Sequence, residues 1–408
     1  MKGLTGMTPL SRRALLRGAA AVSGALAVRG LAAPELPHLR NGELLPDPDF
    51  SLLRKSQPYL IGVRPHRKGG VRLELDPAAL ETPSGKKYLI HNYGHGGGGI
   101  TLSWGCAAVA TELVEQAMER VRLDRKNPAV AVLGTGVVGL TAATEIRRKW
   151  PSLPVTVYAR DLDVRSTTSF VAGGQFEPSG IFREYEGDDS RQRTFANYLR
   201  KARDRIVQIQ RSGQRQLYGV AERKNYTLDH EVRAFDLATP PDVVPGFRKG
   251  KLPFEKLNAV GREYSNWLIN PTILLPRLVQ DLQGAGVRFV RRQFEDVREV
   301  AALAENVIVN CTGYGAKKLF TDAAMVAQRG HLVVLQKTQE KQLYFFSGGC
   351  ENPVIAYVFC CQDDIVVGGT VQAGNDQATA GPGDEPIFQR IIANARQLFG
   401  GHPAACVP

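Results

Sequence analysis

Three glycines with a fixed spacing give this sequence its clearest chemical pattern. Gly134, Gly136 and Gly139 follow the apolar stretch 130–133, which is typical of a buried strand, and precede residues with helical spacing. The first glycine allows a tight turn, the second lets a pyrophosphate approach the backbone, and the third lets helix and strand pack closely. The start of the helix then offers free N–H groups to the phosphates. The pattern predicts a dinucleotide site formed by Gly134, Gly136, Val137, Val138 and Gly139.

The next strand does not decide which dinucleotide is bound. An acidic residue is expected at the end of that strand, where it would bind the ribose hydroxyls. Here the predicted strand is 155–158, and Arg160 precedes Asp161. An arginine at this place also suits the 2′-phosphate of NADP. The glycine pattern alone therefore leaves FAD and NADP open.

Histidines and cysteines do not form a pattern for a metal or a nucleophile. His91 and His95 lie on a predicted strand and a glycine loop rather than on one helix face. The six cysteines have no CxxC spacing, and no Ser/His/Asp arrangement is evident. We expect no metal site.

The elements that must position the glycine turn are strands and helices in alternation. Strands are predicted over 129–133, 155–158, 287–290, 307–309, 331–336, 354–360 and 364–369, and helices over 101–121, 271–283 and 386–398. Early alternation followed by a strand-rich tail predicts an α/β protein with a Rossmann-like domain and a mixed β-sheet domain.

Length and composition fit such a protein. The 408 residues exceed the ~150 that one core usually holds. Hydrophobic residues make up 43% and charged residues 23%, which excludes a disordered or collagen-like chain. The formal net charge is +12, but the basic residues are scattered and do not alternate with aromatic ones. We expect no nucleic-acid partner.

The first 32 residues have the composition of an export signal. Arg12 and Arg13 form a twin-arginine pattern, an apolar run over 18–28 follows, and small residues stand at 30–32. This segment holds five basic residues and no acid, so its removal would lower the net charge from +12 to +7. The apolar run is too short to span a bilayer. We expect export by the twin-arginine machinery to the periplasm or the exterior, with the Pro-rich residues 33–58 as a linker.

Several stretches, taken together, resemble the D-amino-acid oxidase family. The tyrosine–glycine stretch 90–97 is similar to the family's signature near the flavin ring, and it is the most specific of them. The matching stretches are GVRP at 62–65, VRLE at 71–74, IHNYGHGG at 90–97, WGC at 104–106, VYA at 157–159, STT at 166–168, AGG at 172–174, VIVNCTG at 307–313, RG at 329–330 and VGGT at 367–370.

The resemblance implies an oxidoreductase with FAD as its cofactor. It implies that Arg72 binds the substrate carboxylate, that Tyr357 adds a hydroxyl to the same carboxylate, and that the backbone around Gly97 meets the amino group. A second active-site tyrosine of the family falls on Pro353, which leaves the range of accepted side chains open. The further FAD contacts implied are Arg160, Asp161, Thr167, Thr168, Gly173, Phe294, Thr312, Gly313, Gly97, Gly98, Gly99, Ile100 and Thr101.

The resemblance also implies a circularly permuted chain. In the family, the arginine stretch and the tyrosine–glycine signature close the chain, whereas here both precede the glycine turn. Residues 50–121 would be the family's last segment, joined to the nucleotide strand through 122–128. The domains implied are a substrate domain of 59–85, 186–258 and 326–408, and an FAD-binding domain of 86–185 and 259–325.

The expected reaction is oxidative deamination of a D-amino acid. A hydride would pass from Cα to the flavin, the imino acid would hydrolyse to the 2-oxo acid, and H₂O₂ would be released. The alternatives are a dehydrogenase with an acceptor other than O₂, a flavin-binding protein without amino-acid turnover, and a D-aspartate or glycine-type oxidase. An NADP-binding module is favoured only by Arg160. The substrate side chain, the electron acceptor and the oligomeric state do not follow from the sequence.

Overall fold

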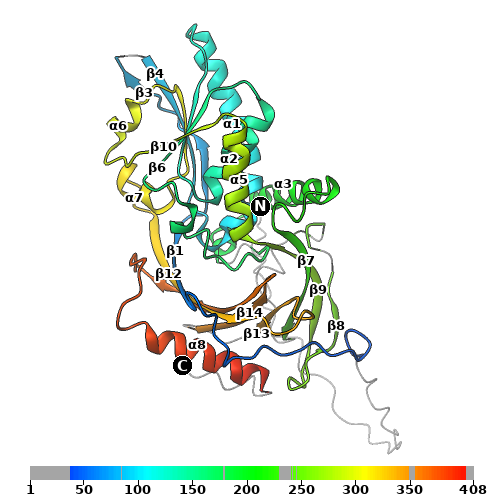
Figure 1. The fold of residues 1–408 in the computed structure, drawn as a ribbon. Helices are drawn as coiled ribbons and strands as arrows, with labels where there is room; N and C mark the ends of the chain where they lie inside the picture. Colours follow the sequence, from blue (N-terminus) through cyan, green and yellow to red (C-terminus); the bar gives the residue numbers. More distant parts are fainter. Residues whose placement is uncertain are drawn as a thin grey trace, which may run out of the picture. The chain divides into compact units, whose positions relative to one another are not determined.

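The structure is a computed structural model, and it describes residues 37–83, 85–177, 180–228, 240, 242–244, 246–348 and 354–400. These residues form two β-sheets with helices packed on them (Figure 1). The predicted twin-arginine signal over 1–32 and Pro353 lie outside the described residues. The two sheets and the helices packed on them make up the described fold.

The first sheet is mixed and holds the strands from three distant parts of the chain. Its nine described strands run in the order β1-β12-β15-β14-β13-β7-β9-β8, with β16 paired to β12. β13 is parallel to β7, and the other pairs are antiparallel. The strands are β1 (Tyr59–Arg67), β7 (Val220–Leu228), β8 (Arg248–Lys251), β9 (Val260–Ile269), β12 (Met325–Gln336), β13 (Tyr344–Gly348), β14 (Val354–Cys360), β15 (Asp364–Thr370) and β16 (Gln372–Ala373).

The second sheet is mainly parallel. Its seven described strands run in the order β10-β6-β5-β11-β4-β2, with β3 paired to β4. β2 and β3 are antiparallel to β4, and the other neighbours are parallel. The strands are β2 (Arg72–Leu75), β3 (Leu80–Thr82), β4 (Gly85–Tyr93), β5 (Val130–Leu133), β6 (Val155–Ala159), β10 (Arg288–Arg291) and β11 (Val307–Asn310).

Helices pack on the apolar faces of the second sheet, because side chains alternate between the two faces along each strand. Val130 and Val132 point into a core shared with four helices, α1, α2, α3 and α5, while Ala131 and Leu133 point into a smaller one on the other face. Figure 1 shows α1, α2 and α5 grouped beside this sheet. The helices of eight or more residues are α1 (Gly99–Leu123), α2 (Val137–Lys149), α3 (Asp189–Arg211), α5 (Pro271–Gly284) and α8 (Glu385–Phe399), and the short ones are α6 (Val297–Ala301) and α7 (Ala316–Leu319).

The two faces of the first sheet have different neighbours. On one face, Phe346 packs in a cluster with Phe388 and Ile391 of α8. On the other face, Leu332 and Phe359 form a cluster against which Tyr357 packs. Alternation along β14 therefore turns Tyr357 away from α8, toward the face that carries Leu60 of β1.

The predicted α/β class with a Rossmann-like sheet and a mixed sheet is confirmed. The two sheets, however, group some strands differently from the two domains that the sequence predicts. β2 and β3, placed by the sequence in the substrate domain, pair with β4 in the second sheet. β9, placed in the FAD-binding domain, pairs with β7 in the first sheet. After the turn at Gly69 and Gly70, both with positive φ, the chain leaves the first sheet and folds back along β4.

The two segments expected to be neighbours in a permuted chain lie together. The rings of Tyr59 on β1 and Phe388 on α8 stack with their centroids 4.4 Å apart. The Gln389 side chain donates a hydrogen bond of 3.4 Å to the hydroxyl of Tyr59. At the other junction, α1 ends at Leu123 and β5 begins at Val130, so only a short exposed link joins them.

Candidate active site

The glycine turn has the strand–turn–helix geometry that the sequence predicts. Gly134 follows β5 with a φ of +118°, a conformation that side-chain-bearing residues rarely adopt. A Cβ atom on Gly134 would lie 2.5 Å from the main-chain oxygen of Cys311, and one on Gly139 would collide with the main-chain oxygen of Gly134. Only glycine fits these two positions.

Two helix N-termini meet beside this turn. α2 begins at Val137, and α1 begins at Gly99 directly after the 3-10 turn 96–98. A Cβ on Gly99 would be 3.7 Å from Cγ1 of Val137, so the two helix starts are in contact. The structure thus brings the predicted run Gly97–Thr101 to the predicted turn 134–139. Free N–H groups and two positive dipole ends at one place favour an anionic ligand.

Ser169 also reaches the start of α2, although the sequence did not single it out. Its Oγ accepts a hydrogen bond of 3.1 Å from the main-chain N–H of Val137. A hydroxyl in a coil segment has no periodic pattern, and the stretch compared with the family ended one residue earlier. The predicted neighbour Thr168 instead donates to the main-chain oxygen of Val63 at 3.0 Å, while Thr167 bonds within its own turn.

Asp161 and Arg160 lie at the end of β6, as predicted. The main-chain oxygen of Asp161 accepts a hydrogen bond of 2.9 Å from the hydroxyl of Thr135, which holds it beside the glycine turn. The Asp161 carboxylate accepts from the N–H of Asp163 at 3.0 Å, and Arg160 is exposed. Both side chains are therefore available at the edge where a dinucleotide's ribose would lie.

The other predicted FAD contacts lie around the same edge of the second sheet. Thr312 and Gly313 follow β11, and a Cβ on Gly313 would be 3.6 Å from Pro65 on β1. Gly173 adjoins Phe359, which a Cβ would approach to 2.7 Å. Phe294 lies further out, edge-on against Tyr158 of β6 with ring centroids 6.0 Å apart. Parallel pairing of β4, β5, β6 and β11 brings their carboxyl ends together at this edge.

These residues fit FAD as the bound group. α/β proteins hold a dinucleotide with three features that are present here. These are glycines with no room for a Cβ atom, helix N-termini, and the carboxyl edge of a parallel sheet. Gly134, Gly136 and Val137 would meet the pyrophosphate, and the run Gly97–Thr101, which contacts Val137, would meet the adjoining part of the cofactor.

The predicted pair of Arg72 and Tyr357 does not share a pocket, which corrects the sequence interpretation. Arg72 lies on β2 at the margin of the second sheet, whereas Tyr357 lies on β14 in the first sheet. The Arg72 guanidinium donates a hydrogen bond of 2.7 Å to the carboxylate of Glu74 and one of 3.1 Å to the hydroxyl of Tyr93. It also lies 3.8 Å from the carboxylate of Asp76. It is thus already paired with carboxylates.

Arg64, rather than Arg72, lies beside Tyr357. It lies on β1, and its Nη1 donates a hydrogen bond of 2.9 Å to the main-chain oxygen of Thr370 at the end of β15. A Cβ on Gly330 would lie 2.6 Å from Nη1 of Arg64, and a Cβ on Gly368 would collide with the ring of Tyr357. Two glycines on adjacent strands therefore make room for the guanidinium and the phenol on one face of the first sheet.

Charge distinguishes the two arginines. Among the described residues, no ion pair joins Arg64 to a carboxylate, and its guanidinium is held by the main-chain oxygen of Thr370 and the hydroxyl of Tyr357. Burial raises the pKa of Tyr357, and the charge and hydrogen bond of Arg64 oppose that rise. A half-buried cation beside a neutral phenol calls for an anionic partner. The stretch GVRP, which contains Arg64, is among those that resemble the family, although the sequence interpretation assigned carboxylate binding to Arg72.

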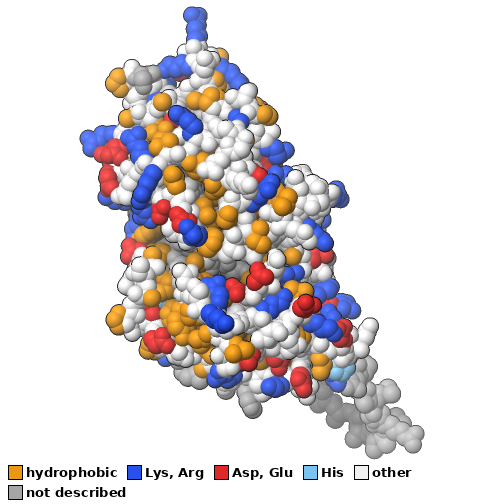
Figure 2. Space-filling model, in the orientation of Figure 1, with side chains coloured by type: hydrophobic (Ala, Val, Ile, Leu, Met, Phe, Trp, Pro, Cys, Tyr) orange, Lys and Arg blue, Asp and Glu red, His pale blue; other side chains and the backbone are white. Residues whose placement is uncertain are grey.

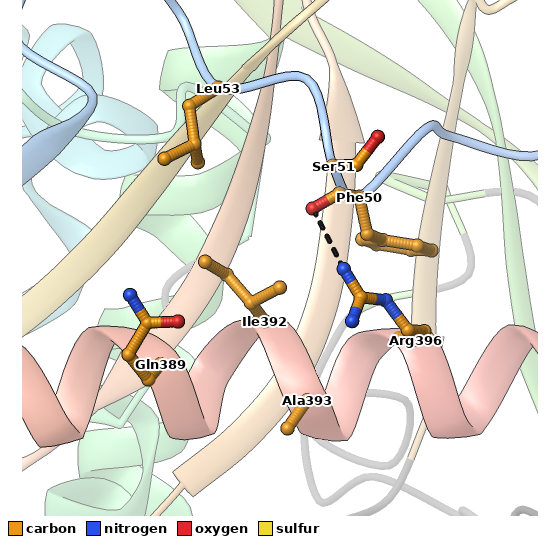
Figure 3. Close-up of a pocket in the computed structure, with 7 residues that line it drawn as sticks. All are labelled: Phe50, Ser51, Leu53, Gln389, Ile392, Ala393 and Arg396. Atoms are coloured by element: carbon orange, nitrogen blue, oxygen red, sulfur yellow. Dashed lines mark hydrogen bonds between the residues drawn. The ribbon is translucent and has the colours of Figure 1, made fainter.

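A separate groove lies on the opposite side of the first sheet. Figure 3 shows it between α8 and the segment before β1, where Arg396 donates a hydrogen bond to the main-chain oxygen of Phe50. The groove has a volume of about 430 Å³, and this hydrogen bond is 3.3 Å long. Its lining residues are Phe50, Ser51, Leu53, Gln389, Ile392, Ala393 and Arg396. α8 packs on the face away from Tyr357, so this groove is not part of the candidate site.

Three further observations concern the partners considered for the chain. On the face shown in Figure 2, Lys and Arg side chains are interspersed with Asp and Glu. Within the described ranges, no helix is both long and apolar enough to cross a membrane. The same ranges contain no group of three or more His, Cys, Asp or Glu side chains placed to hold a metal ion.

Comparisons with known proteins agree with the cofactor site. The sequence model of the family described as DAO, FAD dependent oxidoreductase, matches residues 129–407. Human D-aspartate oxidase is 25% identical over 275 residues, which cover 66% of this chain and 77% of that protein. D-amino-acid oxidase of Fusarium vanettenii is 25% identical over 307 residues, which cover 67% and 79%. The crystal structure of glycine oxidase from Geobacillus kaustophilus superposes with a TM-score of 0.46 at 13% identity, covering 66% of this chain and 78% of that one.

Proposed function

Since this chain belongs to the DAO family of FAD-dependent oxidoreductases, we propose that it oxidatively deaminates a D-amino acid. The enzyme class and the FAD cofactor follow from the family. The names of its relatives, a D-aspartate oxidase and a D-amino-acid oxidase, support an amino-acid substrate. The products would be the imino acid, which water converts to the 2-oxo acid and ammonia, and H₂O₂.

The observation that carries the proposal is the Arg64 guanidinium next to Tyr357. Every amino acid has an α-carboxylate, and arginine binds a carboxylate through two parallel N–H···O bonds. Arg64 has one N–H already fixed on Thr370, and no carboxylate of the described chain pairs with it. The phenol of Tyr357, protonated at neutral pH because burial raises its pKa, would donate a hydrogen bond to the same carboxylate.

The other parts of the site would place the rest of the substrate. The run Gly97–Gly99 lies where the backbone could meet the amino group, and the start of α1 would stabilise negative charge beside it. When bound, FAD would supply the redox chemistry, as the acceptor of a hydride from Cα. Binding the carboxylate at Arg64 fixes Cα in one position, which is the main task left to the protein.

Anaerobic flavin reduction tests this function. Holoenzyme mixed with neutral, acidic and basic D-amino acids should lose its flavin absorbance, and the L-enantiomers and glycine should be slower. Peroxide formed in air then separates an oxidase from a dehydrogenase with another acceptor. Full retention of flavin absorbance with every amino acid would leave a flavin-binding protein without this activity. Fast reduction by glycine or D-aspartate alone would identify the narrower oxidase types.

The permuted chain order is part of the same proposal. The family model begins to match at residue 129, after the segment that carries Arg64 and the tyrosine–glycine signature. The contact of Tyr59 with Phe388 supports an original connection from α8 to β1. Permutation would leave every strand pairing intact, because only the positions of the chain ends change.

Export by the twin-arginine route is likewise proposed from the residues at 1–32. Arg12 and Arg13 precede an apolar run and small residues, in the order that such signals have. Cell fractionation of the full chain and of Arg12→Lys/Arg13→Lys tests it. The wild-type protein should leave the cytoplasm, and retention of both proteins in the cytoplasm would exclude the route.

A further inference from the structure

Arg329 and Asp384 form a buried ion pair near Thr370, the residue of β15 that accepts a hydrogen bond from Arg64. Asp384 is the N-cap residue of α8, and its two oxygens accept hydrogen bonds of 2.6 and 2.8 Å from Arg329 on β12. Their side chains are 8% and 3% exposed. The remaining Arg329 N–H groups donate to the main-chain oxygens of Gln377 and Thr379 at 2.7 and 2.9 Å. Hydrogen bonds from Arg329 hold the pKa of Asp384 well below its usual range, so this carboxylate is ionised and can only accept.

His331 connects this pair to Thr370. The imidazole is fully buried, with Nε2 2.9 Å from Oδ1 of Asp384 and Nδ1 2.6 Å from Oγ1 of Thr370. Nε2 also lies 2.9 Å from Nη1 of Arg329, so both members of the ion pair contact this ring nitrogen, while the Thr370 hydroxyl contacts Nδ1. The same hydroxyl accepts a hydrogen bond of 3.1 Å from the main-chain N–H of His331. Burial lowers the pKa of His331, which favours the neutral imidazole.

Thr370 is the last link before the candidate site. It ends β15 and is 3% exposed, and its main-chain oxygen accepts the 2.9 Å hydrogen bond from Arg64. Its hydroxyl is thus fixed on His331 while its carbonyl is aimed at the guanidinium. A continuous hydrogen-bonded series runs from Arg329 through Asp384, His331 and Thr370 to Arg64.

We propose that Asp384, His331 and Thr370 are positioning residues that fix the Arg64 guanidinium for an incoming carboxylate. This inference rests on the proposed function of Arg64. An arginine side chain has many rotamers, and ordering it on binding costs free energy that a preformed site avoids. The series orders one N–H of Arg64 in advance and leaves the others for the substrate. It also makes α8, which lies on the far face of the sheet, part of the support for the site.

A purely structural role for the series is the competing explanation. Asp384 and Arg329 form a buried ion pair at the start of α8, and the network would then contribute to stability without affecting carboxylate affinity. The two explanations differ in what the Thr370 hydroxyl does. Thr370→Val removes this hydroxyl while it keeps the side-chain shape, and Thr370→Ser retains the hydroxyl. Thr111→Val is the matched control, because the buried Thr111 hydroxyl donates 2.8 Å to Ala107 within α1, away from Arg64.

The experiment measures carboxylate binding to FAD-loaded protein. Butyrate is titrated while flavin absorbance is followed, and the D-amino acid that reduces the flavin fastest is tested anaerobically. Thr370→Val should weaken both ligands roughly five- to tenfold, the loss expected for one hydrogen bond, with a limiting reduction rate within about threefold of wild type. Thr370→Ser should restore the affinity, and Thr111→Val should leave it unchanged. In an Arg64→Leu background, Thr370→Val should have no further effect.

The outcomes separate this inference from the proposed function. If Arg64→Leu leaves butyrate and amino-acid affinity unchanged, the proposed role of Arg64 falls, and the inference falls with it. If Arg64→Leu weakens binding while Thr370→Val does not, only the positioning role is overturned. Equal losses of affinity in Thr370→Val and Thr111→Val would also overturn it, because they would reflect stability alone.

Discussion

Arg64 donates a hydrogen bond to the main-chain oxygen of Thr370, and so joins a strand near one end of the chain to one near the other. β1 and β15 both border β12, which makes this contact possible across one intervening strand. The contact places a cation with no carboxylate partner among the described residues beside Tyr357. The site therefore depends on pairings between segments that are distant in sequence.

The first prediction compares the two arginines. Arg64→Leu should weaken amino-acid binding by about 2–5 kcal/mol, because it removes the charged partner of a desolvated carboxylate. Arg72→Leu should change binding little, because the Arg72 guanidinium is already held by Glu74 and Tyr93. Arg64→Lys should recover only part of the affinity, since a point charge cannot hold both oxygens. The apparent Kd for anaerobic flavin reduction measures all three.

Flavin content is the control for this comparison. Both Leu variants should retain FAD, because the glycine turn at 134–139 lies on the second sheet. A normal Kd in Arg64→Leu together with a raised Kd in Arg72→Leu would restore the interpretation drawn from the sequence alone.

The second prediction concerns the turn that holds the pyrophosphate. Gly139→Ala should lower both the bound FAD and the free energy of unfolding, the latter by about 1–3 kcal/mol, because its Cβ would collide with the main-chain oxygen of Gly134. Gly284→Ala is the matched control, since nothing lies within 4 Å of its Cβ. It should leave FAD binding unchanged and stabilise the end of α5 by about 0.5–1 kcal/mol. Urea unfolding and flavin absorbance per protein give the two quantities. Equal stability of both variants would contradict the tight contact.

The glycine turn could be predicted because its determinants are local. Gly134, Gly136 and Gly139 lie within one strand–turn–helix unit, and their spacing reflects steric demands inside that unit. The same holds for the helix start at Gly99. The Ser169 hydroxyl, in contrast, reaches Val137 from a coil that has no periodicity, so no pattern in the sequence marks it.

The substrate side of the site could not be predicted in this way. Arg64 and Arg72 both lie in stretches that resemble the same family segment. The choice between them depends on which sheet each strand joins. β1 pairs with β12, and β2 pairs with β4, and these are non-local pairings that local sequence does not encode. β7 and β9 were not predicted either, because polar side chains interrupt their apolar pattern, and β13 was missed because its apolar run is only three residues long.

The third prediction is a pH dependence of stability. Burial lowers the pKa of His95 to about 3, against about 6.5 in an unfolded chain. Between these values the unfolded state binds a proton that the folded state does not, so stability falls as the pH falls below 6.5. At pH 5 the loss should be about 2 kcal/mol relative to neutral pH. His95→Gln should remove this part of the stability loss at acidic pH, whereas His38→Gln, at an exposed position, should not. Urea midpoints at pH 7.5 and pH 5 compare the three proteins, and parallel losses in all of them would exclude His95 as the source.

The last prediction tests the permuted order by reversing it. A chain that begins at residue 129, continues to its C-terminus and is joined there by a flexible linker to residue 37, ending at residue 123, should fold and bind FAD. The new ends fall in the exposed link between α1 and β5, so no strand pairing is cut. The new junction connects parts that already touch, because Tyr59 stacks on Phe388 and Phe50 lies 5.6 Å from Phe399 between ring centroids. A control that opens the chain within β11, between Ile308 and Val309, should fail, since this strand lies between β5 and β4 in the middle of the sheet. Flavin absorbance and cooperative unfolding are the readouts. The β11 control should bind no FAD and unfold without cooperativity. If the chain opened at 123–129 behaves in the same way, the link between α1 and β5 is needed for folding, and the permuted order loses its physical basis.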